Sequence, residues 1–284
     1  MLAITSPDPA AIPGPDSFAP STVPFAPVAT RRLILIHGAW QGAWAFGLWL
    51  PHLRRLGWAP EAVDLPGNGC DPADRTPPGE VTLQRYVDHV LSVIDREPGP
   101  VVVLGHSGGG LTATAVAEAA PERVSALVYL AGMMLPSGVG FAELVRACQA
   151  DHPGVDLSGI GPWLADTADR RSSTVDSMAA TRIFLHDVEP VLAGQLAARL
   201  TPQPNGGRDM APVWTPARMG RVPRIYVEAR QDRSLLLPVQ RRMQRLVPGA
   251  HSISLDCGHV PQAACPAEAA QRICDVLAHG APRA

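Results

Sequence analysis

The fold of this chain is decided by the stretch VVVLGHSGG, residues 101–109. Its four apolar residues are typical of a short strand that is buried on both faces of a sheet. The following Gly105-His106-Ser107-Gly108-Gly109 fits the pattern G-x-S-x-G, in which a serine lies on a strained turn between a strand and a helix. The amphipathic segment 111–120 supplies that helix. We therefore predict that Ser107 is exposed at the end of a core strand, with the chemistry of a nucleophile.

Similar apolar runs lie on both sides of this stretch, and each ends at a polar or glycine-rich loop. They cover residues 33–36, 124–130, 224–227 and 252–255. Segments with the apolar spacing of helices alternate with them, at residues 44–56, 81–97, 111–120, 237–246 and 264–279. This alternation predicts an α/β fold with a mostly parallel central sheet and helices on both faces. Ligands of such sheets bind beyond the carboxyl ends of the strands.

The alternation is interrupted once. Residues 135–221 contain no convincing buried strand, and the segments 141–150, 174–184 and 190–200 are predicted to be short helices. We expect a helical cap at 135–221, inserted after a core strand into an α/β core of residues 30–134 and 222–284. Residues 1–29 contain seven prolines and are predicted to form an extended or disordered leader.

Composition excludes several classes of protein. The formal net charge is -2, so no nucleic-acid partner is expected. No Lys occurs anywhere, which excludes a Lys Schiff base and a phosphate-binding loop lysine. The five cysteines are not spaced like metal ligands, so we expect reduced thiols, no metal and no cofactor. With no secretory signal and no run of 18 apolar residues, a cytoplasmic protein without a membrane partner is expected.

Two further residues complete a nucleophilic triad with Ser107. His259 follows the last apolar run, and its imidazole would accept the Ser107 proton and later return it to the leaving group. Asp232 follows the run 224–227 and would orient the imidazole. Asp256 and Glu228 are rival carboxylates, but Glu228 lies within a strand and Asp256 is very close to His259 in sequence. The order Ser, Asp, His along the chain is the one expected for a serine on such a turn.

Acyl transfer also requires backbone donors for the oxyanion that develops on the substrate. The loop His37-Gly38-Ala39-Trp40 follows the first strong strand, so we predict that Ala39 and Gly108 supply these N–H groups. Five apolar side chains are candidate walls of the substrate pocket: Trp40, Met133, Phe141, Trp163 and Trp214.

Several segments together resemble one branch of a known superfamily. These segments are LILIHGAWQGAWAF, GHSGGG, PERVSALVYLAGMMLPSG, YVEARQDRSLLLPVQRRM and CGHVP. They are similar to the plant methylesterase and hydroxynitrile lyase branch of the α/β-hydrolase superfamily and its bacterial esterase relatives. The resemblance spans residues 32–279, and it implies the α/β-hydrolase fold, the triad Ser107, Asp232 and His259, and no cofactor.

The resemblance favours an ester hydrolase over a lyase. Lyases of this branch have Thr at the position of Gly38 and Lys after the catalytic His, where this chain has Val260. We therefore expect a serine esterase that cleaves a small ester. An acyltransferase or a biosynthetic cyclase with the same triad stays open, a lyase or a non-catalytic receptor is less favoured, and a homodimeric state is left open.

Overall fold

A six-stranded parallel sheet forms the centre of the molecule, as the alternating pattern predicts. The computed structural model describes residues 26–280. The strands lie in the order β2-β1-β3-β4-β8-β9, and every neighbouring pair is parallel. Their bounds are β1 (Arg32–Ile36), β2 (Ala59–Val63), β3 (Val101–His106), β4 (Val124–Leu130), β8 (Arg224–Ala229) and β9 (Ala250–Leu255). The predicted fold class is confirmed.

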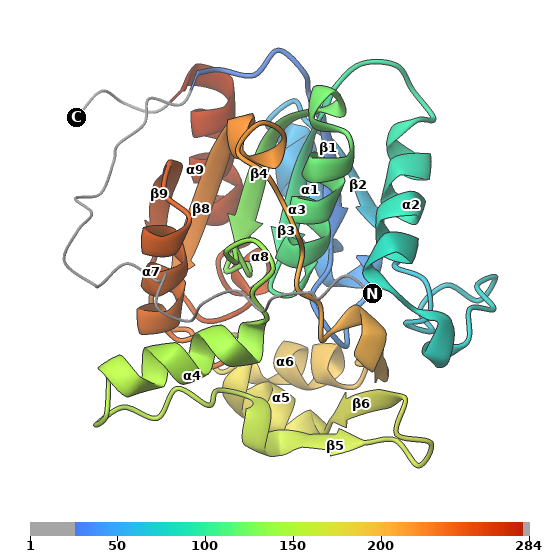
Figure 1. The fold of residues 1–284 in the computed structure, drawn as a ribbon, viewed down its shortest axis with the longest axis vertical. Helices are drawn as coiled ribbons and strands as arrows, with labels where there is room; N and C mark the ends of the chain where they lie inside the picture. Colours follow the sequence, from blue (N-terminus) through green and yellow to red (C-terminus); the bar gives the residue numbers. More distant parts are fainter. Residues whose placement is uncertain (1–25, 281–284) are drawn as a thin grey trace, which may run out of the picture.

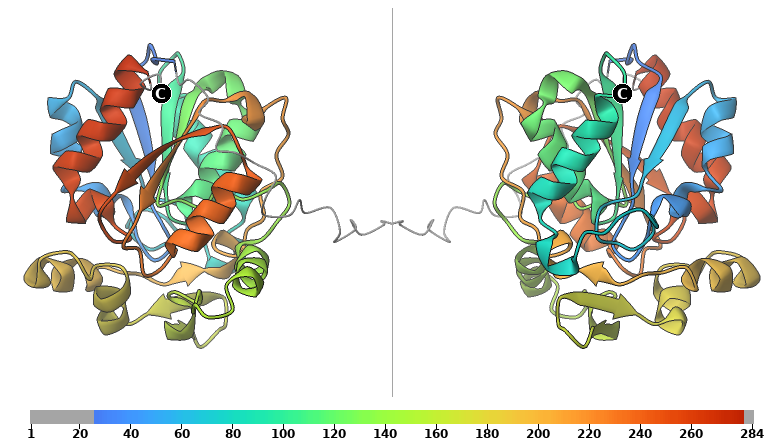
Figure 2. Two further views of the ribbon diagram at one scale, coloured as in Figure 1. Left: turned by 90° about the vertical axis from the view of Figure 1, so that its left-hand side faces the viewer. Right: turned by 90° about the vertical axis from the view of Figure 1, so that its right-hand side faces the viewer.

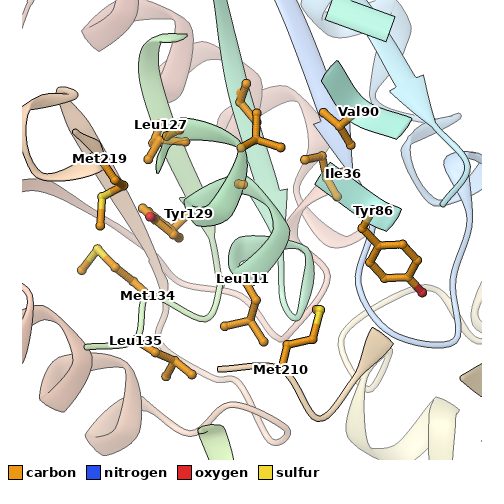
Figure 3. Close-up of a cluster of buried hydrophobic side chains, with 14 of the residues drawn as sticks. Ile36, Tyr86, Val90, Leu111, Leu127, Tyr129, Met134, Leu135, Met210 and Met219 are labelled. Atoms are coloured by element: carbon orange, nitrogen blue, oxygen red, sulfur yellow. The ribbon is translucent and has the colours of Figure 1, made fainter. Parts of the chain in front are cut away.

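Helices cover both faces of the sheet, because the strands are apolar on both faces (Figures 1 and 2). One face packs against α1 (Leu50–Arg55) and α9 (Pro266–His279). The other face packs against α2 (Leu83–Ile94), α3 (Gly109–Ala119) and α7 (Leu237–Leu246). Successive residues of a strand belong to opposite clusters: Ile34 and Ile36 to the second face, Leu33 and Leu35 to the first. Figure 3 shows members of the second cluster, including Ile36, Val90 and Tyr129.

The segment between β4 and β8 lies against the carboxyl ends of the core strands (Figure 1). It contains α4 (Phe141–Asp151), α5 (Ser177–Ile183) and α6 (Pro190–Ala197), close to the predicted helices. It also contains an antiparallel sheet of β5 (Leu164–Asp166), β6 (Ser172–Val175) and β7 (Gln203–Pro204). The predicted helical cap therefore also contains a small sheet that the sequence pattern did not predict. These strands are two to four residues long and partly polar, so they have no apolar run to reveal them.

Other elements also differ from the predicted pattern. The edge strand β2 was not predicted, because its sequence APEAV contains a proline and is only partly buried. The predicted helix 44–56 is divided into a 3₁₀ turn and α1, which has Pro51 in its first turn. The remaining short elements are α8 (Pro261–Ala264) and 3₁₀ turns at Ala43–Phe46, Pro78–Glu80, Pro121–Arg123, Gly161–Trp163, Asn205–Gly207 and Met219–Arg221.

The predicted leader lies mostly outside the described residues. Of residues 1–29, the structure describes 26–29, where the Val28 N–H donates to the Leu277 carbonyl of α9 over 2.8 Å. This short piece is thus attached to the core. Within residues 26–280, no helix has the length and apolar character required to cross a membrane.

Candidate active site

Ser107 occupies the strained turn that its motif predicts. It lies between β3 and α3 with φ 52°, a left-handed conformation that a non-glycine residue rarely adopts. The turn is closely packed: a Cβ on Gly105 would lie 2.5 Å from the Gly109 carbonyl oxygen, and one on Gly109 would lie 2.5 Å from the Ile36 carbonyl oxygen. Both glycines are therefore needed for the helix to approach the sheet, which presents Ser107 at the end of the strand.

A continuous chain of hydrogen bonds leads from Asp232 to Ser107. The His259 Nδ1 lies 2.7 Å from Asp232 Oδ2, and the His259 Nε2 lies 3.0 Å from Ser107 Oγ. A carboxylate can only accept hydrogen bonds, so Nδ1 carries the proton and Nε2 accepts from the serine hydroxyl. Asp232 is itself held, because its Oδ1 accepts from the backbone N–H groups of Ser234 and Leu235 over 2.7 and 2.9 Å. Chemically, this arrangement can remove the proton of Ser107.

The two rival carboxylates lie elsewhere. Asp256 is exposed and pairs with Arg230 over 3.1 Å, while hydrogen bonding from Gln231 and the charge of Arg230 lower its pKa. Burial alone would raise the pKa of Glu228, but hydrogen bonds from Gln244 and Ser254, together with Arg241, hold it below its ordinary value. Glu228 therefore has its own partners between α7 and β9, and neither rival contacts the ring of His259.

Two buried histidines support the backbone around the site. His106 Nε2 lies 2.8 Å from the His259 carbonyl oxygen, and burial together with the neighbouring His259 lowers the pKa of His106 to about 3. His37 Nε2 accepts from the Leu65 N–H, and its Nδ1 lies 2.8 Å from the Gly38 carbonyl oxygen. Burial also lowers the pKa of His37. The lowered pKa makes each ring a weak base, and both nitrogens of each ring already have hydrogen-bond partners, so the two histidines act as hydrogen-bonding supports.

Two backbone N–H groups beside Ser107 are free to bind an oxyanion. Those of Ala39 and Gly108 donate to no acceptor among the described residues. Both residues line the same pocket as Ser107, and Gly108 is the N-cap of α3. If Gly108 carried a Cβ, its one neighbour within 4 Å among the described residues would be the Ala39 nitrogen, at 3.8 Å. The space next to Gly108 is therefore open. These positions fit the two donors that the sequence predicts.

The pocket beside Ser107 has a volume of about 470 Å³ and mostly apolar walls. Trp40, Met133 and Phe141 line it, as predicted. Trp163 and Trp214 do not. Trp163 is 42% exposed next to Arg182, and Trp214 packs on the core with its Nε1 donating to the Leu135 carbonyl. Both were predicted from residue type alone, which does not determine which side of an irregular segment faces the pocket.

Other lining residues were missed by the sequence reasoning. They come from the loop after β2, from α2, from the cap with its helix α4, and from the loop before α7: Leu65, Tyr86, Val145, Leu157, Ile160, Leu164, Gln203, Arg208, Asp209, Met210 and Leu235. The cap also reaches His259, because the centroid of the Phe184 ring lies 5.4 Å from that of the His259 ring. No periodic signal marks these positions, since most lie outside long helices and strands.

The parallel sheet, the serine turn and the inserted cap define an α/β hydrolase. A model of the alpha/beta hydrolase family matches residues 33–272, and the chain belongs to this family.

Its relatives carry ester-cleaving names. The chain is 28% identical to a pyrethroid hydrolase of Sphingobium wenxiniae over 86% of both chains, and 24% identical to methylesterase 7 of Arabidopsis thaliana over 87% of this chain and 95% of that one. A crystal structure of a pyrethroid hydrolase superposes with a TM-score of 0.75 at 26% identity, covering 87% of this chain and 97% of that chain. These likenesses confirm the predicted resemblance to plant methylesterases and bacterial esterases, and they place the chain among ester hydrolases.

Proposed function

We propose that this protein is a serine hydrolase that cleaves a carboxylic ester through an acyl-enzyme. The observation that carries the proposal is the unbroken series of contacts from Asp232 through His259 to Ser107, next to an apolar pocket. In this proposal Ser107 is the nucleophile, His259 the general base and acid, and Asp232 the residue that orients the imidazole. The N–H groups of Ala39 and Gly108 bind the oxyanion.

The reaction proceeds in two halves. Ser107 Oγ attacks the ester carbonyl carbon while His259 Nε2 takes the hydroxyl proton, and the carbonyl oxygen becomes an oxyanion. The intermediate collapses as His259 returns the proton to the departing alkoxide, which leaves an acyl-Ser107 ester. Water then attacks that ester, again with His259 taking its proton, and the acid and free Ser107 are released. Asp232 stabilises the positive imidazolium in both halves.

The pocket favours a neutral ester with a bulky apolar group. Its walls are mostly aliphatic and aromatic, and its volume of about 470 Å³ is within the range of sites for drug-sized ligands. Among the described residues, Arg208 is the one arginine that lines the pocket. Its guanidinium donates two hydrogen bonds to the Asp209 carboxylate, over 2.8 and 3.1 Å, so its charge is already paired. The sequence predicts a small ester, whereas the pocket suits a larger one. A relative named as a pyrethroid hydrolase supports this larger substrate class.

A cyanohydrin lyase fits the pocket poorly. The similar lyases use a Lys after the catalytic His to stabilise departing cyanide, whereas this chain has the buried Val260 there. Arg146, Arg182 and Arg218, which could in principle substitute, do not line the pocket, and Arg208, which does, is paired with Asp209. We expect mandelonitrile cleavage above the spontaneous rate to be undetectable. Cyanide release at a rate comparable to ester turnover, and abolished in Ser107→Ala, would contradict the esterase proposal.

The proposal is tested with chromogenic p-nitrophenyl esters of increasing acyl length, comparing the natural protein with Ser107→Ala. Hydrolysis should be lost in the variant, and a fluorophosphonate should label Ser107, identified by mass spectrometry of the digested protein. Activity that survives in Ser107→Ala, or labelling at another residue, would overturn the mechanism. Adding a primary alcohol distinguishes the acyltransferase alternative, because a transferase would form the new ester in preference to the free acid.

A further inference from the structure

The residue after the proposed oxyanion donor Ala39 has a strained backbone. Trp40 has φ 62°, in the left-handed region that bulky side chains rarely adopt. Such a conformation is energetically unfavourable and persists only where the surroundings impose it. The peptide group between Ala39 and Trp40 carries the Ala39 carbonyl and the Trp40 N–H. Whatever holds Trp40 therefore fixes the chain on one side of Ala39 and limits the directions that the Ala39 N–H can take.

The groups that hold Trp40 come from the cap. Its backbone N–H donates to Gln203 Oε1 over 3.3 Å, and its carbonyl accepts from the Thr201 N–H over 3.0 Å. Its indole Nε1 donates to the Ser173 carbonyl over 3.1 Å. The ring stacks on Phe184 with centroids 6.0 Å apart and belongs to the apolar cluster of the cap helices. Every polar group of Trp40 is therefore bonded to the cap.

Gln203 is in turn fixed by the core. Its amide is buried, and its Nε2 donates to the Tyr86 hydroxyl of α2 over 3.2 Å. Asn68 Nδ2 donates to the same Gln203 Oε1 over 2.9 Å, and the Tyr86 hydroxyl donates to Asn68 Oδ1 over 2.9 Å. Burial raises the pKa of Tyr86 to about 12, so the phenol stays protonated and keeps its donor. The three side chains form a closed ring of hydrogen bonds, which leaves Gln203 one orientation.

We propose that the cap is part of the oxyanion site, with Gln203 as a positioning residue that holds the loop 37–40 in its strained form. The cap then does more than enclose the substrate: its docking on Asn68 and Tyr86 directs the Ala39 N–H at the reacting carbonyl. This inference rests on the proposed function, because it assumes that Ala39 is an oxyanion donor. Gln203 and Tyr86 also line the pocket, so loosening the ring of hydrogen bonds should slow the chemical step by a larger factor than it weakens substrate binding.

Gln203→Met tests this directly, because Met has a similar length and no strong hydrogen-bonding group. We expect kcat to fall by about 10- to 100-fold, because the Ala39 N–H would be misdirected but not removed. KM should change by less than about twofold. The inhibition constant of a trifluoromethyl ketone, whose adduct with the serine carries an oxyanion, should rise by a similar factor. Tyr86→Phe, which removes the hydroxyl from the ring, should show a smaller change of the same kind if Gln203→Met does not fold.

Thr174→Val is the matched control. Thr174 lies in the same cap sheet, its hydroxyl donates to the Ala165 carbonyl, and it does not line the pocket, so its kinetics should be unchanged. The inference would be refuted if Gln203→Met and Tyr86→Phe lowered the melting temperature but kept the natural kcat and inhibition constant. A raised KM with unchanged kcat would also refute it. Failure of the proposed function is separate, because it would appear as activity in Ser107→Ala.

Discussion

Replacing Asp232 with asparagine should nearly abolish turnover and leave the fold intact. In the structure, Asp232 Oδ1 accepts from two backbone N–H groups, and Oδ2 faces His259 Nδ1. An asparagine oxygen can keep the first two bonds. In the opposite orientation, the asparagine NH₂ group would face the backbone N–H groups of Ser234 and Leu235. Both hydrogen bonds would then be lost, and each contributes about 1 kcal/mol to stability. The amide NH₂ is therefore expected to face His259.

The expected loss follows from the imidazole tautomer. A donor opposite Nδ1 favours the tautomer with Nδ1 unprotonated, which puts the proton on Nε2, the atom 3.0 Å from Ser107 Oγ. That nitrogen can then no longer accept the serine proton. We expect kcat to fall by about 10⁴-fold, as in other triads, which corresponds to about 5.4 kcal/mol of barrier.

The assay is steady-state hydrolysis of the best p-nitrophenyl ester, with a thermal melt of each variant. The melting temperature of Asp232→Asn should stay within a few degrees of the natural protein. Asp256→Asn is the control, because Asp256 is an exposed carboxylate three residues before His259, and it should keep its activity. A kcat of Asp232→Asn within tenfold of the natural value, or an inactive Asp256→Asn, would refute the reasoning.

Three further outcomes are expected. Ser107→Ala and His259→Ala should each lower kcat by several orders of magnitude, and the double variant should be little worse because the two residues act as one unit; additive losses would contradict this. His106 has a folded-state pKa of about 3, below its ordinary 6.5, so the unfolded chain binds more protons and the free energy of unfolding falls as pH drops from 6.5. Denaturant titrations between pH 6 and pH 4 measure how steeply the free energy of unfolding falls with pH. This fall should be smaller in His106→Asn than in the natural protein, by about 1.4 kcal/mol per pH unit, and equal slopes would refute the low pKa of His106. Gly109→Ala places a Cβ 2.5 Å from the Ile36 carbonyl oxygen and should lower the free energy of unfolding by about 1–3 kcal/mol, measured by the same titration, whereas an unchanged value would show that the turn can relax.

The core and the places of Ser107, Asp232 and His259 at one edge of the sheet could be predicted because their signals are local. Strands buried on both faces are continuous apolar runs, and the serine turn requires small residues at fixed spacing, as at Gly105 and Gly109. In a parallel sheet, residues that follow different strands meet at one edge, so Asp232 and His259 could be expected near Ser107 despite their distance along the chain. The edge strand β2 lacked this signal because its residues are only partly buried.

The small sheet of the cap and most of the pocket lining were decided by tertiary structure. The strands β5, β6 and β7 are too short to have a pattern, and their pairing depends on contacts between distant segments. For the same reason, no local feature within the cap separates Phe141, which lines the pocket, from Trp163, which is partly exposed. The sequence by itself determined the sheet and the order of the reacting residues, since these depend on periodicity and turn geometry. Which side chains close around the substrate depended on how irregular segments pack, which is a property of the whole fold.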